Sequence, residues 1–208
     1  MKVLELFAGS RSFSKVAEEF GYKTYTTDIE PFDKINQVCN IFDFDLNKML
    51  DEFGSPDIIW ASPPCTYFSV SSIGHHWNKN HTPKTKEAVL GVKIVEETNW
   101  IIKMLEPKYL YIENPRGKLR KLYVINKEPY FRKTVTYCSY GEDRMKPTDI
   151  WTNNFNWNPI QICFNGNRDC HHQPAPRGSR TGTQGMANAY EKSKVPYKLC
   201  KEILDNSK

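Results

Sequence analysis

Short apolar runs alternate with amphipathic segments along residues 1–153. Runs rich in β-branched and aromatic residues predict strands, and segments whose apolar residues recur every three or four positions predict helices. The predicted strands are 2–7, 22–27, 37–41, 57–61, 109–112, 131–138 and 149–151, and the predicted helices are 11–20, 46–53, 86–105 and 196–204. Strands that alternate with helices indicate an α/β fold built on a doubly wound, mostly parallel sheet.

The pattern changes after residue 153, where turn-forming residues become frequent and long apolar runs stop. We therefore expect a compact α/β domain over residues 1–153. Residues 154–208 are expected to form an irregular, Gly/Pro-rich segment whose last helix packs back on that domain. The short basic stretch 177–182 fits either a contact to a polyanion backbone or an ordinary surface loop.

The composition is typical of a soluble globular protein: of 208 residues, 39% are hydrophobic and 25% are charged. No apolar run is long enough for a membrane span or a signal peptide, so we expect a cytoplasmic protein without a membrane partner. In that compartment its six cysteines should be thiols or metal ligands rather than disulfides.

Basic residues cluster in two places, although the net charge is only +5. Residues 116–133 contain seven basic residues and one acid, and residues 75–86 contain three lysines, three histidines and no acid. Such runs are usually solvated faces of the protein. Two of them beside candidate site segments favour a polyanion partner.

A glycine-containing turn, Ala8-Gly9-Ser10, ends the first predicted strand, and Asp28 ends the second. An acid about 20 residues after such a turn has the spacing that places a carboxylate on a ribose hydroxyl. Gly9 would allow close approach of the backbone, and the helix that follows would point its N-terminus at the ligand. A plain strand–helix turn is the alternative interpretation.

Cys65 follows a short apolar strand and two prolines, Pro63 and Pro64, which stop the strand and stiffen the turn. Ligands of open α/β sheets bind at the carboxyl ends of the strands, so a thiolate here would be a fixed nucleophile. We expect the basic loop nearby to lower the pKa of this thiol. The alternative is that Cys65 is a small buried hydrophobic residue.

Taken in order, these stretches resemble the cytosine-C5 DNA methyltransferase family, in particular its small phage-associated members without a full target-recognition domain. Pro64-Cys65 matches the family's nucleophile motif, and Glu113-Asn114 matches the pair that contacts the target base. Tyr140-Gly141 followed by Arg144 and Lys146 is similar to the family's Gln-x-Arg-x-Arg stretch. Leu4 to Ser10 resembles the cofactor motif.

The resemblance implies a Rossmann-like, S-adenosylmethionine-dependent methyltransferase domain over residues 1–153. It implies S-adenosylmethionine as the cofactor, held by residues of the first strand end, the second strand end, the third strand and the cysteine loop. These are Phe7, Ala8, Gly9, Ser10, Asp28, Ile29, Asn40, Ile41 and Pro63. The implied partner is DNA, double- or single-stranded, from which the target base must be flipped out.

The implied reaction is methyl transfer to C5 of cytosine through a covalent bond between Cys65 and C6. Glu113 would assist at N3 of the base, and Asn114 would fix the loop. Arg144 or Lys146 would hold the base carbonyl or its phosphate. The polar segment 70–85 would close over the base, with His75 and His76 as surface histidines.

Three positions depart from the family pattern: Arg11 replaces a glycine, Pro115 replaces a valine, and Thr148 replaces the last arginine. Two alternatives to the DNA methyltransferase therefore stay open. One is a catalytically idle relative that binds nucleic acid or cofactor, and the other is a methyltransferase that acts on RNA or on a free nucleotide. The target sequence and the oligomeric state are not indicated.

The tail contains Cys163, Cys170, His171 and His172, and Cys138 lies near the end of the sixth predicted strand. Zinc bound by these residues could hold the tail in a fixed conformation, because the tail has little hydrophobic core of its own. The spacing Cys-x6-Cys-His-His matches no standard zinc pattern. Zinc is therefore the less favoured interpretation.

Overall fold

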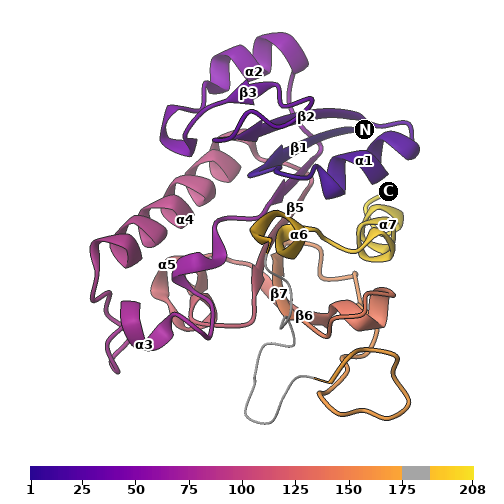
Figure 1. Cartoon of the computed structure of the whole chain (residues 1–208). Coiled ribbons are helices and arrows are strands. Elements are labelled where there is room, and N and C mark those ends of the chain that lie inside the picture. Colours follow the sequence, from indigo (N-terminus) through magenta and orange to yellow (C-terminus); the bar gives the residue numbers. More distant parts are fainter. Residues whose placement is uncertain (175–187) are drawn as a thin grey trace.

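A seven-stranded sheet runs through the protein in this computed structural model, which describes residues 1–174 and 188–208 (Figure 1). The basic stretch 177–182 lies outside the described residues. In sheet order the strands are β3 (Gln37–Val38), β2 (Lys23–Asp28), β1 (Lys2–Leu6), β4 (Ile58–Ala61), β5 (Tyr109–Pro115), β7 (Pro147–Thr152) and β6 (Phe131–Thr136). Only β7 runs antiparallel to its neighbours. The predicted mostly parallel α/β sheet is confirmed.

Helices cover both faces of this sheet. Helices α1 (Ser12–Glu19) and α7 (Tyr197–Asp205) pack together on one face, and α2 (Leu46–Phe53), α4 (Lys86–Leu105) and α5 (Tyr123–Asn126) cover the other (Figure 1). The remaining helices are short: α3 (Ile73–His76), α6 (Ala189–Ser193) and 3-10 turns at Ile41–Asp43, Cys65–Tyr67, Leu119–Lys121 and Tyr137–Tyr140. No helix among the described residues is long and apolar enough to cross a membrane.

The two faces of β4 show how the core forms. Side chains of a strand alternate between the faces of a sheet. Ile58 and Trp60 accordingly pack with Phe13 of α1 and the apolar side of α7, while Ile59 and Ala61 pack with the helices opposite. All four residues of the strand are buried. The strand end that carries the cysteine loop is therefore held from both sides.

Strand β5 is longer than the predicted 109–112. It continues through Glu113, Asn114 and Pro115 because β7 pairs with them, Glu113 opposite Ile150 and Asn114 opposite Asp149. Glu113 and Asn114 thus lie inside the sheet rather than on a loop after it. The predicted third strand is shorter than expected, because the Asn40 side chain accepts a hydrogen bond from Phe42 N and starts a 3-10 turn.

The polar segment 70–85 is more ordered than its sequence suggests. It contains α3, and Trp77 is buried, with its indole N–H donating to the Tyr67 carbonyl at 2.7 Å. His76, expected on the surface, is buried instead, and its Nδ1 lies 2.8 Å from the hydroxyl of Thr85, the N-cap of α4. The interpretation of His76 as a surface histidine was wrong, because its ring helps to join this segment to α4.

Candidate active site

The cysteine loop and strand β5 are joined by one hydrogen bond. Asn114 Nδ2 donates to the carbonyl of Pro63 at 2.9 Å, and Asn114 is fully buried. Cys65 then opens a 3-10 turn, in which its carbonyl accepts from the backbone N–H groups of Phe68 and Ser69. Cys65 itself is exposed. The loop is thereby fixed while its thiol stays accessible.

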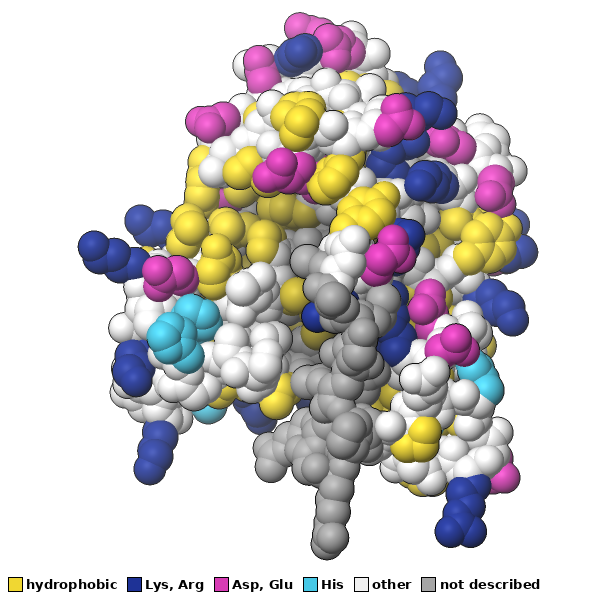
Figure 2. Space-filling model, in the orientation of Figure 1, with side chains coloured by type: hydrophobic (Ala, Val, Ile, Leu, Met, Phe, Trp, Pro, Cys, Tyr) yellow, Lys and Arg dark blue, Asp and Glu magenta, His cyan; other side chains and the backbone are white. Residues whose placement is uncertain are grey.

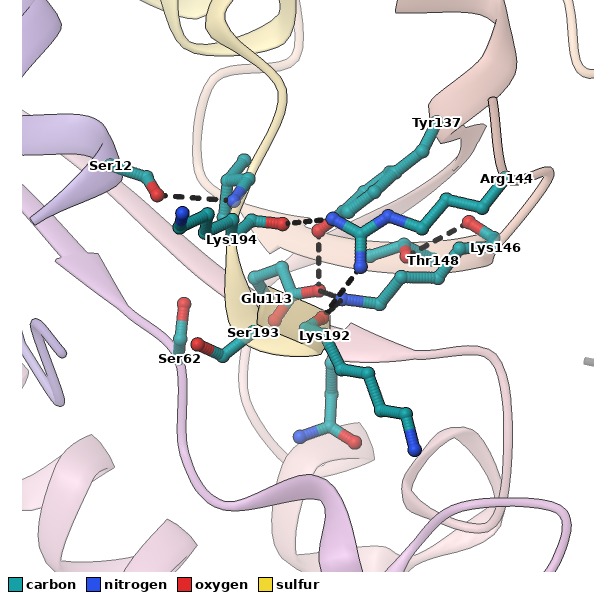
Figure 3. A network of polar contacts seen from close by, with 12 residues as sticks. Ser12, Ser62, Glu113, Tyr137, Arg144, Lys146, Thr148, Lys192, Ser193 and Lys194 are labelled. Atoms are coloured by element: carbon teal, nitrogen blue, oxygen red, sulfur yellow. Dashed lines mark hydrogen bonds and ion pairs between the residues drawn. The ribbon is translucent and has the colours of Figure 1, made fainter. Parts of the chain in front are cut away.

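A buried polar cluster surrounds the carboxyl of Glu113, which is 5% exposed. The Tyr137 hydroxyl donates to Glu113 Oε1 at 2.9 Å, and Lys146 Nζ lies 3.8 Å from the same oxygen (Figure 3). Lys146 Nζ also lies 4.5 Å from the centre of the Tyr137 ring. The carboxyl therefore has both a neutral donor and a cation beside it.

Arg144 is used differently from the base contact that the resemblance implied. Its guanidinium donates to the backbone carbonyls of Glu191, Lys192 and Lys194 at 2.8–3.2 Å (Figure 3). Lys146 Nζ donates to the Lys192 carbonyl as well, at 3.0 Å. Arg144 thus ties the segment around α6 to the sheet, and Lys146 is the basic residue beside the carboxyl.

The environment of Cys65 does not lower the pKa of its thiol as expected. Although the residue is solvent-accessible, the protein atoms around it desolvate the thiol and raise the pKa of Cys65. The positive charge of Lys146 opposes that rise, and Glu113 adds to it. The loop 70–85 does not supply the charge that we expected from it, so desolvation prevails. Burial also lowers the pKa of Lys146, with Glu113 acting in the opposite direction.

Replacing Lys146 by Met should therefore make Cys65 less reactive at a given pH. Loss of the ammonium group removes the main favourable charge on the thiolate, so the pKa of Cys65 should rise further. The measurement is the rate of iodoacetamide alkylation of the Cys65 peptide as a function of pH, followed by mass spectrometry. Lys201→Met, on the exposed side of α7, is the control. An unchanged midpoint in Lys146→Met would contradict the assignment.

A cavity of about 320 Å³ opens beside this cluster, at the carboxyl ends of β1, β2 and β4. Six of the predicted cofactor residues line it: Phe7, Gly9, Asp28, Ile29, Asn40 and Ile41. Thr27, Phe32, Cys39, Ser62, Pro64, Ile94, Tyr190 and Ser193 complete the lining. Figure 2 shows hydrophobic side chains gathered around the hollow on this face. The volume falls at the small end of the range for ligand pockets, about 300–1,000 Å³.

Three predicted cofactor residues lie outside the described lining of the cavity. Ala8 is buried and its N–H donates to the Thr27 carbonyl, and the Ser10 hydroxyl shares a hydrogen bond with Ser12. Pro63 accepts the bond from Asn114 described above. Each of the three is adjacent in the sequence to residues that line the cavity.

Asp28 and the turn at Gly9 are joined directly. Asp28 Oδ2 accepts from Gly9 N at 2.8 Å, and its Oδ1 accepts from Glu30 N at 3.0 Å. Gly9 has a φ of +46°, a conformation that favours glycine. The turn therefore places a carboxylate at the rim of the cavity in a fixed position.

Arg11, which replaces a glycine of the family pattern, does not fill the cavity. It adopts the left-handed backbone conformation that a glycine would favour, with φ +55°. Its guanidinium forms an ion pair with Glu18 and bonds to Thr24. Its side chain lies outside the lining formed by the described residues. The departure thus leaves the candidate ligand site open.

Several residues of the site had no recognisable sequence pattern. Tyr137 reaches Glu113, and Tyr190 and Ser193 line the cavity. The Lys192 carbonyl accepts hydrogen bonds from Arg144 and Lys146. Tyr137 fell within a predicted strand. Helix α6 has no apolar periodicity, and the one sequence signal for this helix was its N-cap residue, Asn188.

Comparisons with known proteins bear on this arrangement. A family model described as C-5 cytosine-specific DNA methylase matches residues 1–127. The chain belongs to this family. The match includes Cys65, Glu113 and Asn114, so the resemblance that these motifs carried is confirmed. Tyr137, Arg144 and Lys146 lie beyond it.

One relative of this chain is a viral protein. A protein of Frog virus 3 (isolate Goorha), named "Probable DNA (cytosine-5)-methyltransferase", is 33% identical over 159 residues, which are 73% of this chain and 70% of that protein. A solved structure described as a DNA modification methyltransferase encoded within an E. coli prophage aligns with a TM-score of 0.54 at 13% identity. That alignment covers 79% of this chain and 52% of the solved one, and it supports the fold.

Proposed function

We propose that the protein transfers a methyl group from S-adenosylmethionine to C5 of cytosine in DNA. The observation that carries the proposal is the meeting of the Cys65 thiol, the Glu113 carboxyl and the Lys146 ammonium group. Lys146 lies 3.8 Å from Glu113, and Lys146 and Glu113 are the main charged neighbours of the Cys65 thiol. Cys65 follows the carboxyl end of β4, Glu113 lies near the carboxyl end of the neighbouring β5, and Lys146 immediately precedes the antiparallel β7. All three therefore lie at the same edge of the sheet, next to the cavity.

The cavity suits an adenosine-type ligand. Ile29 and Ile41 offer apolar contacts for a purine ring, and the Asp28 carboxylate keeps free lone pairs for ribose hydroxyls. Phe32 and Tyr190, whose ring centres lie 5.4 Å apart, bring an aromatic pair from opposite ends of the chain to the lining. S-adenosylmethionine bound there would supply a methyl group on a positively charged sulfur.

The chain's own residues would activate the cytosine. The Cys65 thiolate adds to C6, forming the Sγ–C6 bond, and the ring electrons move toward C5 and N3. The Glu113 carboxyl donates a proton at N3, and Lys146 stabilises the negative charge that develops nearby. After C5 gains its methyl group, water or another base removes the C5 proton. The Sγ–C6 bond then breaks, N3 returns its proton to Glu113, and the thiolate is restored.

DNA is the proposed substrate, and the base must leave the stack to reach these groups. Part of the basic run 116–133 is available to a phosphate backbone, because Arg116, Lys121, Lys127 and Arg132 are exposed. Arg120 is not, since it forms an ion pair with the buried Asp149 at 2.5 Å. We therefore propose that these four exposed side chains contact the DNA phosphates.

The experiment is a tritiated-methyl transfer assay with the purified protein and several acceptors. Duplex DNA, single-stranded DNA, RNA and free deoxycytidine nucleotide are compared, with product analysis to locate the label on C5 of cytosine. Label on DNA supports the proposal, and label on RNA or free nucleotide alone would redirect it to those substrates. Cofactor binding without label on any acceptor would favour the idle relative.

Removing the Tyr137 hydroxyl should slow this reaction. Tyr137→Phe leaves Glu113 without its 2.9 Å donor, and an unmet buried acceptor costs about 1–3 kcal/mol, which corresponds to about a 5- to 150-fold loss in kcat. The check is kcat and KM in the methyl transfer assay. Tyr140→Phe is the matched control, because its hydroxyl bonds to Glu202 on α7 instead. Equal kcat for the two variants would contradict a role of the Tyr137 hydroxyl in catalysis.

A further inference from the structure

Three cysteines and a histidine meet at one point outside the active site. They are Cys138, Cys163, Cys170 and His172, and one ligand atom of each lies within 4.8 Å of all the others. Cys163 Sγ and His172 Nδ1 are 3.7 Å apart. Cys138 and His172 are buried, and the other two are half-buried. Cys138 lies about 25 residues before the nearest of the other three in the sequence.

We propose that this cluster binds one structural zinc ion. Bonds of about 2.3 Å to sulfur and 2.0–2.1 Å to nitrogen place tetrahedral ligand atoms roughly 3.5–3.8 Å apart. The 3.7 Å separation matches that spacing, and contraction of the longest separations would complete it. Three thiolates and one imidazole form the soft, closed ligand set of structural zinc sites. With four protein ligands, no position is left for a substrate.

The contacts around the cluster separate ligands from bystanders. His171 is exposed, and its Nε2 lies 3.0 Å from the Glu142 carbonyl, so it points away from the four ligands. Asn167 Nδ2 donates to Cys163 Sγ at 3.4 Å, the kind of hydrogen bond that supports a thiolate ligand. His172 is therefore the proposed ligand, and the adjacent His171 serves as its matched control.

Zinc would hold a segment that has little core of its own. Ile160, Ile162 and Phe164 are all about half exposed or more, and residues 154–174 contain no helix or strand. Figure 1 shows this segment, in orange, beside the β6–β7 hairpin. Hydrogen bonds from Cys163 N to Thr136 and from Ser139 to the Gln161 carbonyl already join it to the turn that carries Cys138. The metal would fasten the same two segments together, next to Tyr137.

The experiment measures metal in the untagged, full-length protein, since a polyhistidine tag would bind zinc itself. Elemental analysis should find about one zinc per chain. Replacement by Co²⁺ should give the visible bands of tetrahedral cobalt and strong thiolate-to-cobalt charge transfer. Stripping the metal should lower the melting temperature by roughly 5 °C or more. Wild-type protein that contains no zinc and gives no such cobalt spectrum would overturn the proposal.

Variants test which side chains bind the metal. His172→Ala and the double variant Cys163→Ser/Cys170→Ser should lose the zinc, whereas His171→Ala and Cys200→Ala should keep it. If the double variant fails to fold, the cobalt spectrum of the wild type still decides, because it counts thiolates without a substitution. Full zinc in the double variant, or a Cys163–Cys170 disulfide in unreduced protein, would rule out the site. These readouts do not depend on methyl transfer.

Discussion

Cys65→Ser is expected to abolish methyl transfer, by about 10⁴-fold or more, while cofactor binding stays within a few-fold of wild type. A serine hydroxyl stays un-ionised near neutral pH and adds poorly to C6. Because Cys65 is exposed and its side chain forms no core contact, the melting temperature should not change. The check combines the tritium assay with calorimetric titration of S-adenosylhomocysteine.

A trapping experiment tests the role of Cys65 as the nucleophile without measuring turnover. DNA with 5-fluorocytosine offers no removable proton at C5, so the protein should stay bonded to C6 and migrate as a protein–DNA adduct under denaturing conditions. Wild type and Cys200→Ala, whose thiol is fully buried away from the cavity, should form the adduct. An adduct in Cys65→Ser would show that another group is the nucleophile.

Glu113→Gln should lower kcat by about 10²–10⁴-fold, because an amide cannot pass a proton to N3 of the base. The amide oxygen can still accept the bond from Tyr137, so the neighbouring tyrosine stays in place. Lys146 loses an ion pair at 3.8 Å, so a small loss of thermal stability is also expected. Steady-state kinetics on the best DNA substrate give kcat and KM separately.

The matched control for this substitution is Glu202→Gln. Glu202 also accepts a tyrosine hydroxyl, that of Tyr140, but it lies on α7 behind the sheet. It should keep kcat within about threefold of wild type. Glu113→Gln with the same kcat as Glu202→Gln would remove the carboxyl from the mechanism and leave it a structural role.

Local signals explain why much of the fold could be predicted. Helix α4 was expected over 86–105 and found there, because Thr85 caps its first turn by accepting from Ala88 N. Strand β4 ends at Ala61, just before Pro63 and Pro64, as the sequence indicates. The end of β5 could not be predicted, because Glu113 and Asn114 are strand residues only through pairing with β7, more than 30 residues later. Pairing of that range has no local signature.

The same distinction applies to the site. Motifs at 64–65 and 113–114 are local, and they indicated the side chains that we propose as reactive. The role of Arg144 depends on carbonyls about 50 residues away, and the zinc ligands are spread over 138–172 with no standard spacing. The pKa of Cys65 was misjudged for a related reason: sequence shows neighbouring charges but not the water that folding removes.

Helix α6 lies between the cavity and the polar cluster around Glu113. Tyr190 and Ser193 face the cavity, while the carbonyls on either side of them hold Arg144 and Lys146. A methyl donor bound against α6 should also affect the position of Lys146, because Lys146 Nζ donates to the Lys192 carbonyl of this helix. Thermodynamic reciprocity then requires the base to strengthen or weaken donor binding by the same factor. The methyl donor and its acceptor should accordingly bind with heterotropic cooperativity.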